Sequence, residues 1–238
     1  MTALFKQQPF IDGVLGNTPL FAGIPRDEIA ALASRCWVVA ARRGDTLAGS
    51  GERLPGLFVM GYGQATLVLR APGQRERVLR IVTAGQSFGA AAAVLGRASG
   101  YEARALVDAK VIVVPSASIG GLMDRQPRFS RSLLRMLAER VLDLCAEVGA
   151  GSLHSGGQRL ASYLDALAEP IQGNGGWSVH LPVSKTVVAA RLGMKKETLS
   201  RLLRRLAADG LIEVSRGEIA ILDRAALTRL LPAHRDRM

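Results

Sequence analysis

The stretch from residue 181 to residue 222 constrains the fold most, because its middle carries two stripes at helical spacing. One stripe is apolar and consists of Leu199, Leu202, Leu203 and Leu206. The other is polar and consists of Glu197, Ser200, Arg201 and Arg204. Both sets recur at i, i+3, i+4 and i+7, which places each set on one face of an α-helix. We therefore expect one face of this helix to pack on a core and another to present a carboxylate, a hydroxyl and two guanidinium groups.

A shorter helix is predicted just before this one. Ser184 precedes the run Lys185–Leu192 and is a residue type that favours the N-cap position of a helix. Gly193 then interrupts the run, as the turn between two packed helices does. The order of cap, short helix, glycine turn and long helix predicts a helix-turn-helix.

A β-hairpin is predicted just after the long helix. Asp209-Gly210 ends the helix. The runs Leu211–Val214 and Glu218–Leu222 alternate apolar and polar residues as short strands do, and Ser215-Arg216-Gly217 is the turn between them. Two helices followed by a hairpin predict a winged helix-turn-helix.

The polar stripe suits double-stranded DNA as a partner. Guanidinium forks bind guanine edges and phosphates, and a carboxylate accepts from the cytosine amino group. An ordinary amphipathic helix with a solvated charged face is the alternative interpretation, but the succession of elements around it favours DNA binding. The residues that we predict to contact DNA are Ser184, Lys185, Lys195, Lys196, Glu197, Thr198, Ser200, Arg201, Arg204 and Arg216.

The net charge of +11 also favours a polyanionic partner, because basic side chains release counterions from phosphates. The 238 residues suit two modest domains, and an apolar fraction of 48% indicates a globular chain. Cys36 and Cys145 stand alone, which favours a reducing compartment and argues against a disulfide framework or an iron–sulfur cluster. No run has the length of a membrane span or the apolar core of a signal peptide. We therefore expect a cytoplasmic protein with no membrane partner.

The predicted helix-turn-helix resembles that of the CRP/FNR family of bacterial transcription regulators. The residues that carry the resemblance are Leu181-Pro182, Lys185, Val188-Ala189, Leu192-Gly193-Met194 and Glu197-x-x-Ser200-Arg201. Ser200 is typical of the FNR branch, and the set looks most like regulators of denitrification and nitrogen-oxide response. Lys195 departs from the usual Ser or Thr cap and adds a positive charge near the phosphates. The resemblance implies a homodimer, RNA polymerase as a further partner and a role as an activator.

Residues 37 to 114 read as many short strands with glycine-containing turns, which predicts an antiparallel β-roll or barrel. The predicted strands are Trp37–Ala40, Leu57–Met60, Gln64–Leu69, Val78–Val82, Arg104–Leu106 and Lys110–Val114. The pattern alone also fits an unrelated β-sandwich. The resemblance favours a cyclic-nucleotide-binding-like roll, because Gly44-Asp45, Gly63, Gly85-x-x-Phe88-Gly89 and Ala105-Leu106 fall where that fold has its turns. Residues 1 to about 35 are expected to form short helices that lead into it.

A long helix is predicted from Pro127 to about Gly149. It carries an apolar seam at 3-4-3-4 spacing, formed by Leu134, Leu137, Val141, Leu144 and Val148. Packing on its own domain is the alternative for this helix, and Leu133 and Met136 on another face suit that role. The equivalent helix of the resembling family forms the dimer interface, so we predict dimerisation through the seam.

The Gly/Ser-rich segment 149–157 is predicted to break this helix and act as a hinge. The fold class is therefore α+β, and the chain divides into three parts. They are a β-roll sensor domain (1–126), a dimerisation helix with its hinge (127–152) and a winged helix-turn-helix domain (153–238).

Family members that bind cyclic AMP use a Gly-Glu pair for the ribose and an Arg-Ser or Arg-Thr pair for the phosphate. The Glu position here is Ala90, and the second pair is Ser99-Gly100, so cyclic AMP is not expected to bind. A shifted phosphate contact through Arg97 or Arg104 is the alternative. The residues predicted to line the effector pocket are Phe88, Gly89, Ala90, Arg97 and Arg104.

The resemblance to nitric-oxide and carbon-monoxide sensors implies haem as a candidate cofactor. Haem needs an axial His, Cys, Met or Tyr, and the candidate ligands are Cys36 and His154. A buried structural role for Cys36 and a solvated one for His154 are the competing interpretations. No metal site is assigned.

These patterns predict a DNA-binding transcription regulator that binds an inverted-repeat operator and responds to a signal other than cyclic AMP, such as nitric oxide or redox state. An effector-independent regulator with a collapsed pocket, or a cyclic-nucleotide-responsive one, is the alternative. An enzyme is not expected, since the β-domain carries no catalytic set and no histidine cluster of the kind that a metal enzyme needs.

Overall fold

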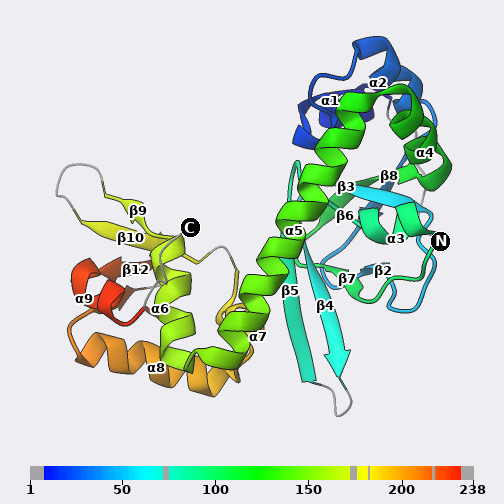
Figure 1. Cartoon of the computed structure of the whole chain (residues 1–238). Helices are drawn as coiled ribbons and strands as arrows, with labels where there is room; N and C mark the ends of the chain where they lie inside the picture. The colour runs from blue at the N-terminus through cyan, green and yellow to red at the C-terminus, as the bar shows by residue number, and fades with distance from the viewer. Residues whose placement is uncertain (1–7, 72–74, 172–175, 182, 216–217, 232–238) are drawn as a thin grey trace. The chain divides into compact units, whose positions relative to one another are not determined.

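The computed structural model describes residues 8–71, 75–171, 176–181, 183–215 and 218–231. The chain forms two compact units, Met1–Leu142 and Asp143–Met238. Their boundary falls within the long helix α5 (Pro127–Leu153) (Figure 1). The predicted domain limits, which place all of this helix outside the sensor, stay a prediction.

The N-terminal unit is built on two four-stranded antiparallel sheets. One has the order β1-β8-β3-β6, with β1 (Trp37–Ala41), β8 (Ala109–Pro115), β3 (Gly56–Tyr62) and β6 (Ser87–Phe88). The other has the order β2-β7-β4-β5, with β2 (Thr46–Ala48), β7 (Glu102–Ala105), β4 (Gln64–Ala71) and β5 (Arg75–Thr83). The predicted β-roll and its six strands are confirmed. Two short strands of this unit, β2 and β6, were not predicted, because runs of two or three residues show no alternation.

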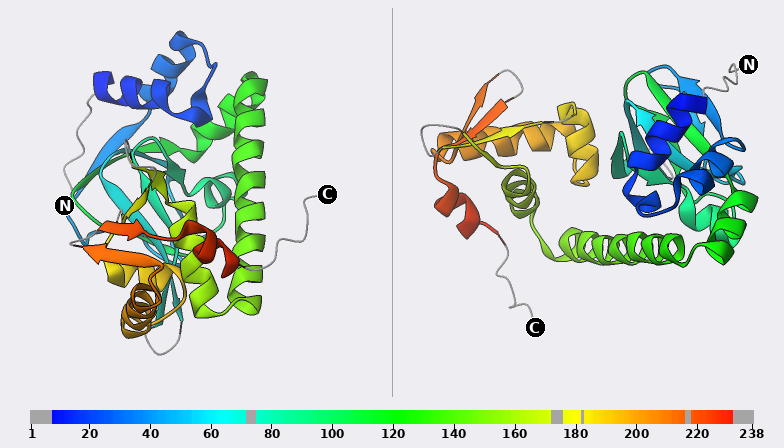
Figure 2. Two further views of the ribbon diagram at one scale, coloured as in Figure 1. Left: turned by 90° about the vertical axis from the view of Figure 1, so that its left-hand side faces the viewer. Right: turned by 90° about the horizontal axis from the view of Figure 1, so that it is seen from above.

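Helices cover one face of the first sheet. They are α1 (Gln8–Asn17), the 3₁₀ turn η1 (Pro19–Phe21), α2 (Arg26–Ala33), α3 (Ala90–Leu95), α4 (Ser116–Arg125) and the first half of α5. α1 and α2 lie at the end of the roll where α5 begins (Figures 1 and 2). The stacked rings of Phe21 and Phe129, 5.4 Å apart, join η1 to α5. Each helix therefore adds apolar side chains to a core outside the roll.

Strand β3 separates two cores. Leu57 and Val59 pack in the cluster under the helices, whereas Phe58 and Met60 pack between the sheets. Successive side chains of a strand point to opposite faces, so a strand buried on both faces is apolar at every position. This accounts for the uninterrupted apolar run in residues 57–60.

The C-terminal unit contains α6 (Gly156–Ala166), α7 (Lys185–Arg191), α8 (Lys196–Ala208) and α9 (Arg224–Arg229). Its antiparallel sheet has the order β11-β12-β10-β9, with β11 (Ile212–Ser215), β12 (Glu218–Ile221), β10 (Trp177–His180) and β9 (Glu169–Pro170). Gly193 adopts φ +64° between α7 and α8, a value that glycine tolerates best. The predicted winged helix-turn-helix is confirmed.

The predicted hinge over 149–157 begins too early, because α5 continues to Leu153. Glycine weakens a helix by only about 1 kcal/mol per residue, and Gly149 lies within the helix. The break comes at the start of α6, where the Ser155 side chain accepts from the Gln158 amide and the Gln158 side chain accepts from the Ser155 amide. This capping box fixes a new helix start. Of the helices in the described ranges, none combines the length and apolarity that crossing a membrane requires.

Candidate DNA-binding surface and effector region

Helix α8 is held in place by its apolar stripe. Leu199, Leu203 and Leu206 are buried in the core of the C-terminal unit, and Leu202 packs against that core while partly exposed. Burial of a leucine side chain contributes roughly 1.5–3 kcal/mol, so the three buried leucines fix the rotation of α8 about its axis. Its other face is thereby directed outward.

The outward face carries the polar stripe. Glu197, Arg201 and Arg204 are exposed, and Ser200 is half-buried. Within the described part of the chain, the side chains of Glu197 and Arg201 form no hydrogen bond or ion pair, whereas Arg204 Nε donates weakly to the Ser200 carbonyl at 3.4 Å. These groups are therefore available to an external partner.

Two lysines stand at the start of α8. Lys195 occupies the N-cap position and forms no side-chain capping bond, and Lys196 is the first helical residue; both are exposed. The N-terminus of a helix carries a partial positive charge, so two ammonium groups are unfavourable there unless an anion is close. A DNA phosphate would supply that anion. Thr198, two residues after Lys196, is half-buried.

The start of α7 lies where Ser184 was predicted to cap it. The predicted N-cap position of Ser184 is confirmed, although its hydroxyl makes no capping bond. Its carbonyl accepts from the Val187 and Val188 amides, and these backbone bonds are sufficient to begin the helix. Ser184 is exposed and Lys185 is half-buried.

A groove of about 600 Å³ runs between α8 and the wing. It brings together Lys185, Ser200 and Arg204 with Val214 of β11. Three of the predicted DNA contacts thus share one concave surface. Arg216, predicted to lie at the tip of the wing, falls outside the described residues.

Two arginines, Arg159 and Arg224, connect the elements that support this surface. The sequence patterns did not identify either of them. The Arg159 guanidinium on α6 donates to the carbonyls of Leu192 at 2.9 Å and His154 at 2.7 Å. Arg224 pairs with Asp165 at 2.9 Å and stacks over the Trp177 ring at 3.7 Å. Their partners lie 5 to 59 residues away in sequence, so no local spacing could have indicated these roles.

Comparisons with known proteins agree with this geometry. A model of the Crp-like helix-turn-helix domain matches residues 158–230, and a model of the cyclic nucleotide-binding domain matches residues 38–126. The transcriptional regulator LdrP of Thermus thermophilus is 30% identical over 190 residues, which cover 79% of this chain and 93% of LdrP. This chain belongs to the CRP/FNR family of transcription regulators. It is therefore a DNA-binding regulator and not an enzyme.

Two further proteins resemble the chain at lower sequence identity. The CRP-like cAMP-activated global transcriptional regulator of Mycobacterium tuberculosis is 24% identical over 221 residues, covering 92% of this chain and 99% of that protein. The structure of FixK2 from Bradyrhizobium japonicum is 20% identical and has a TM-score of 0.71, covering 84% of this chain and 98% of that one. The likeness to FixK2 shows a shared fold alone.

In the region that matches the cyclic nucleotide-binding domain, protein side chains contact one another around Gly89. Phe88 is buried and stacks on Phe58, with ring centroids 4.8 Å apart. The Gly89 amide, at the start of α3, donates to the Tyr101 hydroxyl at 2.9 Å. Burial raises the pKa of Tyr101 above its ordinary value, so the hydroxyl stays protonated at neutral pH. A protein hydroxyl therefore occupies a donor that would otherwise be open to a ligand.

Arg97 and Arg104, named above as an alternative phosphate contact, differ in their surroundings. Arg104 is bound by Glu102 at 2.7 Å and by Glu76 at 3.2 Å, and the hydrogen bond to Glu102 is the main cause of the raised pKa of its guanidinium. A phosphate would have to displace these carboxylates. Arg97 is exposed, and Ala90, the first residue of α3, is buried.

The sensor-domain candidate for haem ligation does not fit that role. Cys36 is buried, its Sγ donates to the Leu32 carbonyl at 3.3 Å, and burial raises the pKa of the thiol to about 12. The side chain is only 1% exposed and is enclosed by the apolar core, which suits a structural thiol and not a haem ligand. His154 is half-buried between α5 and α6, and its proposed ligand role stays a prediction.

The apolar seam of α5 is largely exposed within one chain. Leu134 is 64% exposed, Val141 58% and Val148 63%, and Leu144 is exposed as well. Leu137 differs, because it is half-buried and packs against the N-terminal core beside Met136. Leu133 is fully within that core. The helix therefore has one face for its own domain and another that has no apolar cover among the described residues.

Proposed function

We propose that this CRP/FNR-family chain acts as a homodimer that inserts α8 of each protomer into successive major grooves of an inverted-repeat operator. The observation that carries the proposal is the face formed by Glu197, Ser200 and Arg201. It is solvent-accessible, it lies on a helix fixed by buried leucines, and its two charged members have no protein partner in the described part of the chain. Recognition helices of two-fold dimers meet half-sites about 34 Å apart.

Each side chain has a distinct task in this proposal. Arg201 presents its guanidinium fork to O6 and N7 of a guanine, and Glu197 accepts from the amino group of a cytosine. Lys195 and Lys196 bind phosphates beside the helix N-terminus, where an anion is favoured. Ser184 and Lys185 at the start of α7, and Arg204 in the groove beside the wing, add backbone contacts. By resemblance to the FNR branch, each operator arm reads as a TTGAT-like sequence.

The exposed seam of α5 supports a homodimer. A large apolar stripe left in water is unfavourable, and a second copy of the same helix covers it through knobs-into-holes packing. Leu134, Val141 and Val148 supply the centre of this interface. The dimer acts in the cytoplasm, where it recruits RNA polymerase as an activator.

The region around Gly89 supports a signal other than cyclic AMP. Ala90 replaces a ribose-binding carboxylate, Ser99 replaces the phosphate-binding guanidinium, and Arg104 is held by two carboxylates. The Mycobacterium tuberculosis relative is named as cAMP-activated, but this chain lacks the charges that such a ligand requires. We assign it a nitrogen-oxide or redox signal. Haem remains an expectation from resemblance only, since Cys36 does not suit it. An effector-independent regulator is the second candidate, favoured by the internal bond between Gly89 and Tyr101.

The proposal is tested by selecting bound duplexes from a random DNA pool, in parallel with and without added cyclic AMP. The full-length protein is expected to enrich an inverted repeat with TTGAT-like arms to the same extent in both selections. An asymmetric motif would contradict two-fold binding. Enrichment that depends on cyclic AMP would contradict the proposed signal and leave the DNA-reading assignment standing.

A further inference from the structure

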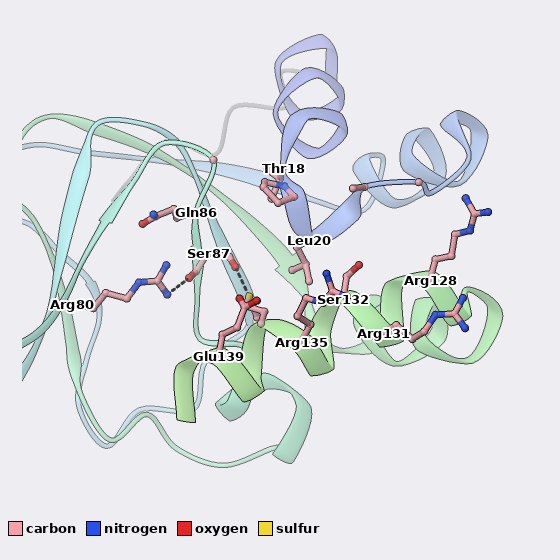
Figure 3. A pocket seen from close by; sticks show the side chains of 15 residues that line it. Thr18, Leu20, Arg80, Gln86, Ser87, Arg128, Arg131, Ser132, Arg135 and Glu139 are labelled. Carbon is pink, nitrogen blue, oxygen red and sulfur yellow. Dashed lines mark hydrogen bonds between the residues drawn. The ribbon is translucent and has the colours of Figure 1, made fainter. Parts of the chain in front are cut away.

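A pocket of about 630 Å³ opens in the N-terminal unit (Figure 3). Helix α5 forms one wall and the segment from Thr18 to Gly23 another, while the turn between β5 and β6 closes one end. Leu20 and Met136 line it with apolar surface. No assignment made above uses this pocket.

Arginines dominate the α5 wall. Arg128, Arg131 and Arg135 come from successive turns of the helix and are all exposed. In the described part of the chain, none of the three forms an ion pair or a side-chain hydrogen bond. Their spacings, i+3 and i+4, place like charges side by side, an arrangement that destabilises a helix. A bound anion would neutralise this repulsion between the three guanidinium groups.

The charge balance of the pocket is positive. Arg80 lines the opposite end and donates to the Ser87 carbonyl at 3.3 Å, and Glu139 is the single acidic residue among the described lining side chains. The guanidinium of Arg128 lies against Gly23, since a Cβ there would sit 3.3 Å from Nη1. With a rise of about 1.5 Å per residue, the helix spreads its three arginines over roughly 10 Å.

The pocket is distinct from the dimer seam and from the Gly89 region. Its three α5 arginines lie roughly 100° around the helix from Leu134 and Val141, since successive residues are about 100° apart. Leu134 follows Arg131 by three residues and is its neighbour on the helix surface, but neither Leu134 nor Val141 is among the described residues that line the pocket. Gly89 and Tyr101 are not among them either.

We propose that this pocket binds a small polyanion that carries two or more carboxylate or phosphate groups on a short carbon or phosphate chain. Guanidinium forks bind both groups in a bidentate manner. A row of three forks over roughly 10 Å suits several negative groups better than one. The Ser132 hydroxyl on the same wall adds a donor, and Leu20 and Met136 contact the uncharged body of the ligand. The inference does not depend on how the chain reads DNA.

The test is isothermal titration calorimetry on the full-length protein, with tripolyphosphate in one arm and citrate in the other. The pocket variant is Arg128→Gln, Arg131→Gln, Arg135→Gln. The control variant is Arg35→Gln, Arg43→Gln, Arg77→Gln, which removes the same charge from exposed positions outside the pocket. Polyanions that bind the DNA-reading surface give the same heat in all three proteins, because neither variant alters that surface.

We expect saturable binding of at least one probe to the wild type, about tenfold or more weaker binding to the pocket variant and unchanged binding to the control. The arm that binds more tightly identifies phosphate or carboxylate as the preferred group. Equal weakening in both variants would show non-specific charge attraction and overturn the proposal, as would a lack of saturable binding in both arms. Without anion, the pocket variant is expected to melt at or above the wild-type temperature, because like-charge repulsion is removed. A lower melting temperature would show that the arginines are structural.

Discussion

Arg201 and Lys196 lie on the same helix, yet the structure gives them different surroundings. Arg201 is on the outward stripe in the middle of α8, whereas Lys196 stands at its positively polarised start. A guanidinium in mid-helix reaches base edges in a major groove, and an ammonium at the helix start meets the phosphate backbone. We therefore expect the difference in position between Arg201 and Lys196, rather than in charge, to separate sequence reading from general affinity.

The sequence predicted this pair of roles because they depend on local spacing along one helix. It did not predict the bond from the Gly89 amide to the Tyr101 hydroxyl, since the two residues lie on different elements. Neither did it predict the carboxylates that hold Arg104, of which Glu76 is 28 residues distant. Residue type predicted the N-cap position of Ser184 correctly. It did not indicate that the backbone, and not the hydroxyl, would satisfy the helix start.

Cys36 provides a prediction at this scale. Burial, and to a lesser extent the charge of Asp12, raises the pKa of its thiol from 9.0 to about 12, so the folded state favours the neutral thiol. The resulting stabilisation is complete below pH 9 and is lost as the pH rises towards 12. At pH 8 we expect an aromatic disulfide reagent to modify exposed Cys145 promptly and Cys36 only as the chain unfolds. Prompt release of a full thiol equivalent by the Cys145→Ser variant would contradict this.

Helix α5 shows what an element adds to its residues. The heptad-like spacing predicted an apolar seam, and the exposure of Leu134, Val141 and Val148 agrees with that pattern. Leu137 belongs partly to the domain core, because the helix also packs on its own unit. The spacing could not reveal this double role, nor the extension of the helix to Leu153. The role of Leu137 depends on packing by segments remote in sequence. The end of α5 depends on the capping box at Ser155, which starts α6.

The double substitution Leu134→Asp, Val141→Asp tests the seam. Both side chains are exposed in one chain, so the variant is expected to fold, but an unpaired carboxylate buried in a dimer costs at least about 3 kcal/mol. We expect sedimentation to show monomers and operator affinity to fall sharply. The matched control is Leu95→Asp, Val107→Asp, which charges two exposed apolar residues elsewhere in the same unit. An intact dimer in the seam variant would place the interface elsewhere.

At the scale of the whole molecule, short-range patterns predicted the order of the units well. The β-roll has a sequence pattern of short alternating runs separated by turn residues. The helix-turn-helix has an apolar and a polar stripe on its second helix and a glycine, Gly193, in its turn. The pocket beside Arg131 was not foreseen, because it forms where η1, the β5–β6 turn and α5 meet. Sites assembled from distant segments depend on tertiary packing, which a single sequence reveals only through resemblance.

We propose that the basic homodimer separates general DNA affinity from sequence reading. The net charge of +11 supports binding to any duplex through counterion release. Specificity then depends on the few side chains that touch base edges, twice in each operator. Salt dependence and base preference should therefore respond to different substitutions on α8.

Fluorescence anisotropy on matched and guanine-substituted operators, at several salt concentrations, tests this claim most directly. Arg201→Ala is expected to cost about 1–3 kcal/mol per half-site on the matched operator and to reduce the preference for guanine. Lys196→Ala, the comparison variant, is expected to weaken binding to both operators alike and to flatten the salt dependence by about one unit of slope. Equal weakening of both operators by Arg201→Ala would show that Arg201 binds a phosphate and does not read a base.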